Sequence, residues 1–309
     1  MRSQATILEL QKVSKFYGKT EALKDISFKV AEGEIYGLIG PNGSGKTTVL
    51  KTIAGHLRPD SGRIFISGYD QQKEFADAVD FVGAMVEYPA HYPYMTGRQN
   101  LALTANMYPE ISKNRIQEVV ELVGLQNHID MKVRHYSLGM RQRLALAESI
   151  LPYPQVMLLD EPMNGLDPIG LKDLTELLKG LSANGMAILV TSHILEQMDS
   201  LCDKIGILAS GYLIAERDME EFRNRKSSVL ELTVSDAEAA RDILEERLPE
   251  AVTVTQAAGK SLVLEITGAE AWEINRLLLT EGLEVSEVFS RRQTLEELYT
   301  SLTGGAEIE

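Results

Sequence analysis

The chain has 309 residues, of which 44% are hydrophobic and 25% are charged, and this length allows two ordinary globular domains. Its formal net charge of −14 argues against a nucleic-acid partner, because binding to a phosphate backbone needs clustered Lys and Arg. No stretch approaches the roughly 18 consecutive apolar residues that span a bilayer, and no signal-peptide pattern is present, so we expect a cytoplasmic chain that reaches a membrane only through a partner.

The order of the predicted elements favours an α/β core. Short apolar stretches between residues 6 and 36 predict a small sheet, and residues 96–150 have a helical pattern. Strands that alternate with helices are typical of α/β proteins. The further predicted elements are buried strands at 34–39, 156–160 and 187–192, a strand at 61–68, helices at 171–181 and from about His193, and a hairpin at 204–215.

Residues 222–228 mark a boundary, and a different pattern follows it. We predict two domains, 1–222 and 227–309, and the second is strongly acidic, with 17 Asp and Glu against 6 Lys and Arg. Its element order is that of the ferredoxin-like split βαβ arrangement. The predicted elements are a strand (229–235), a helix (236–248), two strands (251–256 and 261–266), a helix (269–281), a strand (283–289) and a helix from residue 294.

Residues 40–48 have the pattern G-x-x-x-x-G-K-T of a phosphate-binding P-loop, between a predicted strand and a predicted helix. The glycines let successive backbone N–H groups point inward at an anion. Lys46 adds a charge that can reach the phosphates, and Thr47 offers a hydroxyl to Mg²⁺. The residues predicted to bind phosphate are Gly40, Pro41, Asn42, Gly43, Ser44, Gly45, Lys46, Thr47 and Thr48.

Acidic and basic side chains follow two of the later predicted strands. Asp160 can hold the Mg²⁺ shell, and the adjacent Glu161 can orient an attacking water. His193 follows the next strand and can contact the γ-phosphate or its water. The alternative interpretations are an exposed strand terminus for the acids and a surface side chain for the histidine.

Two helix starts have capping residues. Asp167, followed by Pro168, suits the N-cap of a helix with proline at its first position. Ser137 suits the N-cap of a second helix, whose N-terminus would attract phosphate.

These motifs, in this order, resemble the nucleotide-binding ATPase subunit of an ATP-binding cassette (ABC) transporter over residues 6–222. The resemblance implies an α/β P-loop ATPase core with antiparallel β and helical subdomains, and ATP and Mg²⁺ as ligands. It implies that residues 40–48 are Walker A, 156–161 Walker B, 137–141 the signature motif and 163–167 the D-loop, with His193 as the switch histidine.

The resemblance also assigns roles residue by residue. It implies that Glu161 polarises water, that His193 positions the γ-phosphate, and that Tyr17 stacks on adenine; a half-buried strand residue is the alternative interpretation of Tyr17. Further contacts to ATP are implied for Ser137, Gly139, Met140 and Asp167, and contacts to Mg²⁺ for Thr47, Glu87 and Asp160.

Two positions depart from the family pattern. Leu138 replaces a signature glycine, which would alter the approach of backbone to phosphate. Glu87 stands where a glutamine is usual after a strand, and it adds charge near ATP. These changes, and the segment 291–297, resemble the bacitracin-resistance and lantibiotic-immunity branch of drug and peptide exporters.

One set of motifs per chain implies a dimer, with each ATP between the P-loop of one subunit and Ser137 and Gly139 of the other. The partners implied are membrane permeases on separate chains, which would dock near residues 87–101. The aromatics there, Tyr88, Tyr92 and Tyr94, suit equally a docking groove or ordinary packing. A soluble or regulatory ABC ATPase without cargo is the alternative, and dimer support or regulation is the role we favour for the C-terminal domain.

Overall fold

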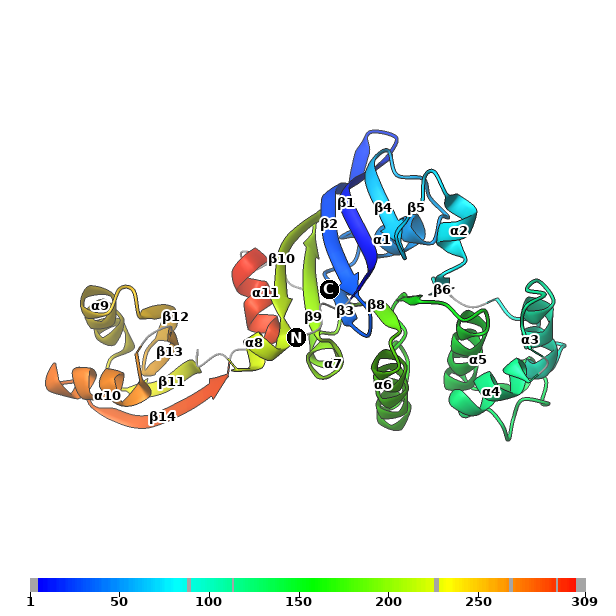
Figure 1. Cartoon of the computed structure of the whole chain (residues 1–309). Helices are drawn as coiled ribbons and strands as arrows, with labels where there is room; N and C mark the ends of the chain where they lie inside the picture. The colour runs from blue at the N-terminus through cyan, green and yellow to red at the C-terminus, as the bar shows by residue number, and fades with distance from the viewer. Residues whose placement is uncertain are drawn as a thin grey trace. The chain divides into compact units, whose positions relative to one another are not determined.

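The computed structural model describes residues 5–87, 90–112, 114–224, 228–266, 269–292 and 294–303. Contacts divide the chain into two compact units (Figure 1). The first unit comprises the chain up to Met219 together with the segment from Leu302 onward. The second unit comprises Glu220–Ser301. Within the described ranges, no helix is long and apolar enough to cross a membrane.

A six-stranded sheet forms the centre of the first unit, in the order β10-β9-β3-β8-β7-β6. All neighbouring strands are parallel except the β9–β10 hairpin. Every residue of β3, β7 and β8 is buried, as expected of parallel strands covered on both faces. The strands are β3 (Ile35–Ile39), β6 (Val82–Met85), β7 (Val156–Leu159), β8 (Ala187–Ser192), β9 (Lys204–Ala209) and β10 (Tyr212–Asp218).

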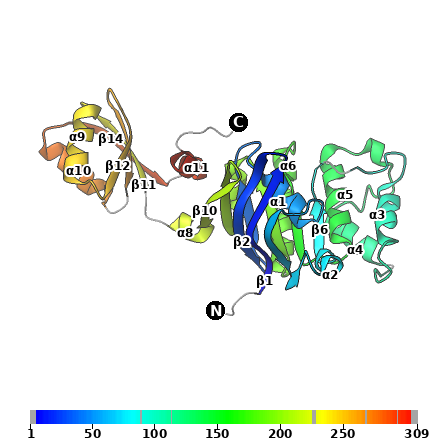
Figure 2. The same cartoon turned by 90° about the horizontal axis from the view of Figure 1, so that it is seen from above.

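A second, antiparallel sheet has the order β2-β1-β4-β5, with all four strands labelled in Figure 1. Figure 2 shows β1 and β2 of this sheet from above. Burial alternates along β2, where Ile26, Phe28 and Val30 are buried and their neighbours are more exposed. These side chains share one core cluster with helix α1 (Lys46–Ile53) and with the central sheet. The cluster therefore fixes α1 between the two sheets. The strands are β1 (Thr6–Tyr17), β2 (Thr20–Ala31), β4 (Ser61–Ile66) and β5 (Tyr69–Asp70).

Three helices lie together at one side of the first unit: α3 (Gly97–Ala105), α4 (Arg115–Leu122) and α5 (Leu138–Ile150). α5 begins where Ser137 accepts a hydrogen bond from the backbone of Met140, as its sequence predicts. The remaining elements of this unit, the last of which runs on into the second unit, are α2 (Phe75–Val79), the short 3₁₀ turn η1 (Val133–His135), α6 (Pro168–Ala183), α7 (Leu195–Leu201) and α8 (Met219–Asn224).

The start of α6 agrees with the predicted cap, since Asp167 accepts from the backbone of Gly170 and Pro168 occupies the first position. The helix is therefore longer than the apolar pattern of residues 171–181. α7 begins at Leu195, so His193 stands in the connection after β8 rather than in the helix.

The second unit is a four-stranded antiparallel sheet with two helices against one face. Its strand order, β12-β13-β11-β14, is that of the ferredoxin-like arrangement. Leu230 and Leu264 of the sheet share a core with Leu244 of α9 and Ile274 of α10. The predicted fold class is confirmed. The elements are β11 (Ser228–Val234), α9 (Ala237–Arg247), β12 (Val252–Ala258), β13 (Ser261–Ile266), α10 (Ala271–Thr280), β14 (Val285–Arg292) and α11 (Leu295–Thr303).

Hydrogen bonds from one arginine connect the start of α11 to the sheet. Arg291 of β14 donates to Glu297 on α11, at 2.8 and 2.5 Å, and to Glu231 of β11 at 2.8 Å. Thr294 and Glu297 also exchange side-chain to backbone hydrogen bonds, which is a capping box. These bonds lower the pKa of the Glu297 carboxyl, with the bond from Arg291 as the largest cause.

The domain boundary itself falls partly outside the described residues, which omit 225–227. The contact division lies between Met219 and Glu220.

Candidate nucleotide-binding site

The P-loop connects β3 to α1, and two of its glycines, Gly40 and Gly45, have no room for a side chain. A Cβ atom at Gly40 would lie 2.1 Å from the carbonyl oxygen of Leu208, so only glycine fits. Gly45 has a φ of 112°, which side chains rarely permit. The hydroxyl of Ser44 is buried without a hydrogen-bond partner among the described residues. The loop thus offers an unsatisfied polar atom at the position where a phosphate is expected.

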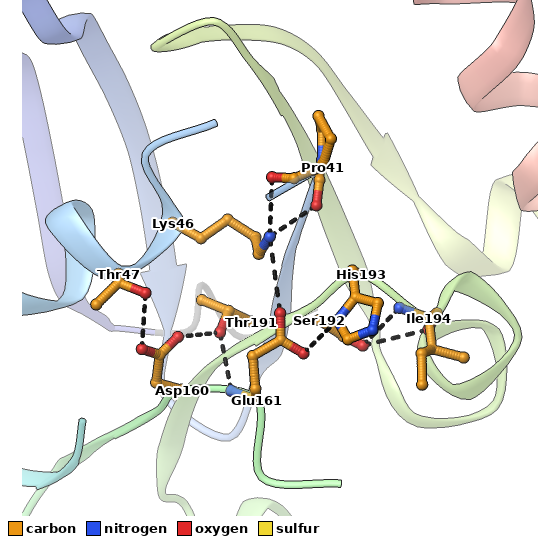
Figure 3. Close-up of polar contacts among 10 residues, drawn as sticks. Pro41, Lys46, Thr47, Asp160, Glu161, Thr191, Ser192, His193 and Ile194 are labelled. Carbon is orange, nitrogen blue, oxygen red and sulfur yellow. Dashed lines mark hydrogen bonds and ion pairs between the residues drawn. The ribbon is translucent and has the colours of Figure 1, made fainter. Parts of the chain in front are cut away.

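Lys46 is buried and already bonded within the protein. Its ammonium donates to the carbonyl oxygens of Gly40 (2.7 Å) and Pro41 (3.2 Å). It also lies 3.6 Å from Oε1 of Glu161 (Figure 3). Burial lowers the pKa of the Lys46 ammonium, against the opposing effects of Glu161 and Asp160.

Asp160 follows β7 and accepts hydrogen bonds from two hydroxyl groups. Thr47 donates to one carboxylate oxygen at 2.8 Å, and Thr191 donates to the other at 2.7 Å (Figure 3). Thr191 in turn accepts a bond from the backbone N–H of Glu161 at 3.0 Å. Sequence reasoning missed Thr191, although it lies two residues before His193 in the same strand-end segment. It joins the ends of β7 and β8.

The Glu161 carboxylate lies between Lys46 and His193. Its Oε2 is 2.8 Å from Nδ1 of His193, on the side away from the lysine (Figure 3). Its backbone has a φ of 49°, in the left-handed region that non-glycine residues seldom adopt. The structure therefore brings together the two residues predicted to be catalytic.

Glu87 follows β6, the edge strand next to β7, and pairs with Lys51 of α1. The hydrogen bond from Lys51 is the largest cause that lowers the pKa of the Glu87 carboxyl, and the same bond raises the pKa of Lys51. Lys51 was also missed. The available signal was its spacing, because it stands four residues after Thr47 and so shares a face of α1.

One cavity of about 660 Å³ brings the predicted metal ligands together. It is lined by Thr47, Met85, Glu87, Leu138, Arg141, Gln142, Asp160, Glu161, Pro162 and Asn164.

The oxygen donors around this cavity fit Mg²⁺ shared with a phosphate. Thr47 and Asp160 are already in hydrogen-bond contact, and hydroxyl and carboxylate oxygens are the ligands that Mg²⁺ prefers. The part of the chain that the structure describes contains no group of three His, Cys, Asp or Glu residues able to hold a metal alone.

The signature segment contributes to two cavities, because Leu138 and Arg141 line the cavity beside Thr47 while other signature residues line a second one. Ser137, Gly139 and Met140 line a cavity of about 390 Å³ together with Asp167 at the start of α6. No described residue of the P-loop lines that cavity. Within one chain, these four predicted ATP contacts therefore line a different cavity from Thr47, although Leu138 and Gln142 line both cavities.

Leu138, the departure from the signature pattern, packs against the D-loop of its own chain. A Cβ atom at Gly165 would lie 2.6 Å from a methyl group of Leu138, so the leucine occupies the space that a side chain at 165 would need. Gln142, one turn further along α5, donates to the carbonyl of Asn164 at 3.0 Å. These contacts link the N-terminal part of α5 to the D-loop.

Tyr17 lies at the end of β1 and is 50% exposed. Its backbone pairs with Thr20 at the end of the β1–β2 ladder, while its ring is half exposed.

Comparison with known proteins gives the family. The model of the ABC transporter family matches residues 23–164. An uncharacterized ABC transporter ATP-binding protein of Bacillus subtilis, YdbJ, is 40% identical and the match covers 96% of this chain and 95% of the relative. The bacitracin transport ATP-binding protein BcrA of Bacillus licheniformis is 34% identical, with 98% and 99% covered. A solved dimer of an ATP-binding cassette with ADP and Pi has a TM-score of 0.63 at 25% identity, and the match covers 69% of this chain and 99% of that chain.

The chain therefore belongs to the ABC transporter family. It is an ATP-binding, ATP-hydrolysing subunit of that family, and the predicted resemblance and enzyme class are confirmed. The two curated relatives also extend over the C-terminal unit.

The Leu138 contact predicts a specific pattern of stability. Gly165→Ala should lower the free energy of unfolding by about 1–3 kcal/mol, because it combines a positive φ with a clash. Leu138→Ala removes the clashing methyl group and should restore part of that loss in the double variant. Denaturant unfolding of the wild type, both single variants and the double variant measures this. Purely additive losses would contradict the contact.

Proposed function

We propose that the chain binds Mg²⁺ and ATP at this site as half of a dimer, and that hydrolysis drives separate membrane permease subunits. The observation that carries the proposal is the Glu161 carboxylate, which lies between Lys46 and His193 beside the Thr47–Asp160 pair. This is the arrangement that phosphoryl transfer to water requires, because such sites work by positioning and by stabilising charge.

Each residue has a role in this proposal. Thr47 and Asp160 would hold Mg²⁺, which when bound neutralises charge on the phosphates and orients them. Lys46 would exchange its carbonyl partners for phosphate oxygens. Glu161 would accept a proton from the attacking water. His193 would keep the Glu161 carboxylate in position through their hydrogen bond and would contact the γ-phosphate.

A second copy of the chain would complete each site. Ser137, Gly139, Met140 and Asp167 gather in their own cavity, apart from the P-loop. Two copies arranged head to tail would bring each group to the P-loop of the partner. The dimeric state of the solved relative supports this arrangement.

The permeases would dock near residues 87–101, where exposed tyrosines form a small patch before α3. Tyr94 and Tyr92 are 65% and 49% exposed. Tyr92 and Tyr94 contact each other edge to face, with ring centroids 5.9 Å apart. Tyr88, predicted to belong to this patch, lies outside the described residues. Exposed patches of this kind mark interaction sites.

The cargo we propose is a drug, a peptide antibiotic or a lipid-like substrate that is exported. The support is the similarity to the bacitracin transport protein, over nearly the whole of both chains. We propose that the permeases hold the chain at the cytoplasmic face of the membrane.

Glu161→Gln should lower the rate of ATP hydrolysis on the order of 10²–10⁴-fold, because the amide cannot accept the proton of water. It should leave ATP binding intact and trap an ATP-bound dimer. Phosphate release and size-exclusion chromatography with ATP measure the two effects. Glu196→Gln on α7, an exposed acid, is the matched control. Unchanged hydrolysis in Glu161→Gln would refute the role.

Tyr94→Glu should abolish co-purification of the permease without changing ATP affinity. The test is a pull-down of the tagged chain in mild detergent, with the bound chains identified. Phe75→Glu, which alters a ring 52% exposed on α2, is the control. Recovery of a polytopic membrane protein with the wild type and the control, and not with Tyr94→Glu, supports transport. Recovery of a dimer without such a partner favours an ABC ATPase that moves no cargo.

The C-terminal unit is proposed to support or regulate the dimer. Removal of residues 227–309 should then weaken ATP-dependent dimerisation, measured by analytical ultracentrifugation with Glu161→Gln in both chains. Retained ATP affinity is the control for folding of the shortened chain. Dimerisation as strong as that of the full chain would rule out a supporting role.

A further inference from the structure

We propose that Lys51 is a positioning residue that holds the Glu87 carboxylate back from the metal–nucleotide site, so that the pair sets how strongly nucleotide binding depends on Mg²⁺. The inference rests on the proposed function of this site. It concerns two side chains that the family pattern does not pair, because Glu87 itself departs from that pattern.

The sheet places Glu87 beside the residues proposed to hold the metal. β6 and β7 are parallel, with Met85 opposite Leu159, and the N–H of Asp160 donates to the carbonyl of Met85 at 2.9 Å. Glu87 therefore emerges next to Asp160 and Glu161. Like Glu161, it leaves its strand with a positive φ, here 69°. Its side chain lines the same cavity as Thr47 and Asp160.

Each of the three carboxylates at these strand ends has its own partners. Asp160 accepts from two hydroxyl groups, and Glu161 lies between Lys46 and His193. Glu87 has Lys51. The P-loop end of α1 thus satisfies Glu161 through Lys46, and the next turn of α1 satisfies Glu87 through Lys51.

The side chains of the Lys51–Glu87 pair are more exposed to solvent than those of the Lys46–Glu161 pair. The side chains of Lys51 and Glu87 are 28% and 63% exposed, against 6% and 21% for Lys46 and Glu161. An exposed ion pair exchanges easily, because water and salt screen it. A divalent cation in the cavity can therefore compete with Lys51 for the carboxylate.

A Glu87 carboxylate paired with Lys51 and one without Lys51 have opposite effects on nucleotide binding. While the pair is intact, Lys51 offsets the charge that Glu87 would add beside the phosphates, so nucleotide binds without metal at little extra cost. When Lys51 is removed, the free carboxylate repels the phosphates and attracts Mg²⁺. The dependence of nucleotide binding on Mg²⁺ should then rise.

The test is a double-mutant cycle on the full-length chain, with binding as the readout. The quantity is the ratio of Kd without Mg²⁺ (in EDTA) to Kd with Mg²⁺, for a non-hydrolysable ATP analogue, by calorimetry. Lys51→Met should raise the ratio about tenfold, and Lys51→Arg, which keeps the pair, should leave it within about twofold. In the Glu87→Gln background, Lys51→Met should change the ratio by less than about twofold.

Each other outcome overturns the inference. An equal change in both backgrounds would mean that Lys51 acts as a charge independent of Glu87, and no change in either would mean that the pair has no bearing on the metal. Lys46→Ala separates the two levels of argument. If the wild type binds the analogue and Lys46→Ala does not, the proposed nucleotide site stands, and an unchanged Kd ratio in all Lys51 variants refutes only the role of Lys51. If the wild type and Lys46→Ala bind the analogue equally, both the proposed function and the role of Lys51 are refuted.

Discussion

The organisation of the first unit depends on the accumulation of carboxylates at the ends of two adjacent strands. β6 and β7 end side by side, and Glu87, Asp160 and Glu161 follow them within a few residues. Three acids in one place repel each other unless each finds a donor or a cation. Helix α1 and the end of β8 supply these groups. The packing that fixes α1 between the two sheets thus also brings its two lysines to the carboxylates.

The predicted nucleotide contacts of the P-loop and of the signature segment line different cavities within one chain, and Leu138 lines both. The cations of α1 are already engaged with the carboxylates, and the signature residues pack with the D-loop through Leu138 and Gly165. α5 is thereby joined to the segment that follows Glu161. A displacement of the glutamate segment would reach the signature end of α5 through direct contact, with no intervening element.

Much of this was predictable from local sequence. The P-loop pattern, the apolar strands and the helix caps Ser137 and Asp167 are encoded by neighbouring residues, and so is the order of elements in the C-terminal unit. Thr191, Lys51 and the contact of Leu138 with Gly165 were not predicted. Each joins residues more than 25 positions apart through side-chain orientation, which periodicity and motif spacing do not describe. The start of α7 was misplaced because the residues after β8 serve Glu161 before the helix begins.

The internal bonds of Lys46 have a consequence for which anions this loop can retain. Its ammonium already has two carbonyl oxygens and a nearby carboxylate as partners, so an incoming anion must replace partners of comparable strength. A single phosphate or sulfate has only the contacts of the loop to offset this exchange. A nucleotide with several phosphates compensates through contacts along its whole length. The internal bonds of Lys46 thereby weaken the binding of any anion, and the loss weighs most on an anion that contacts the loop alone.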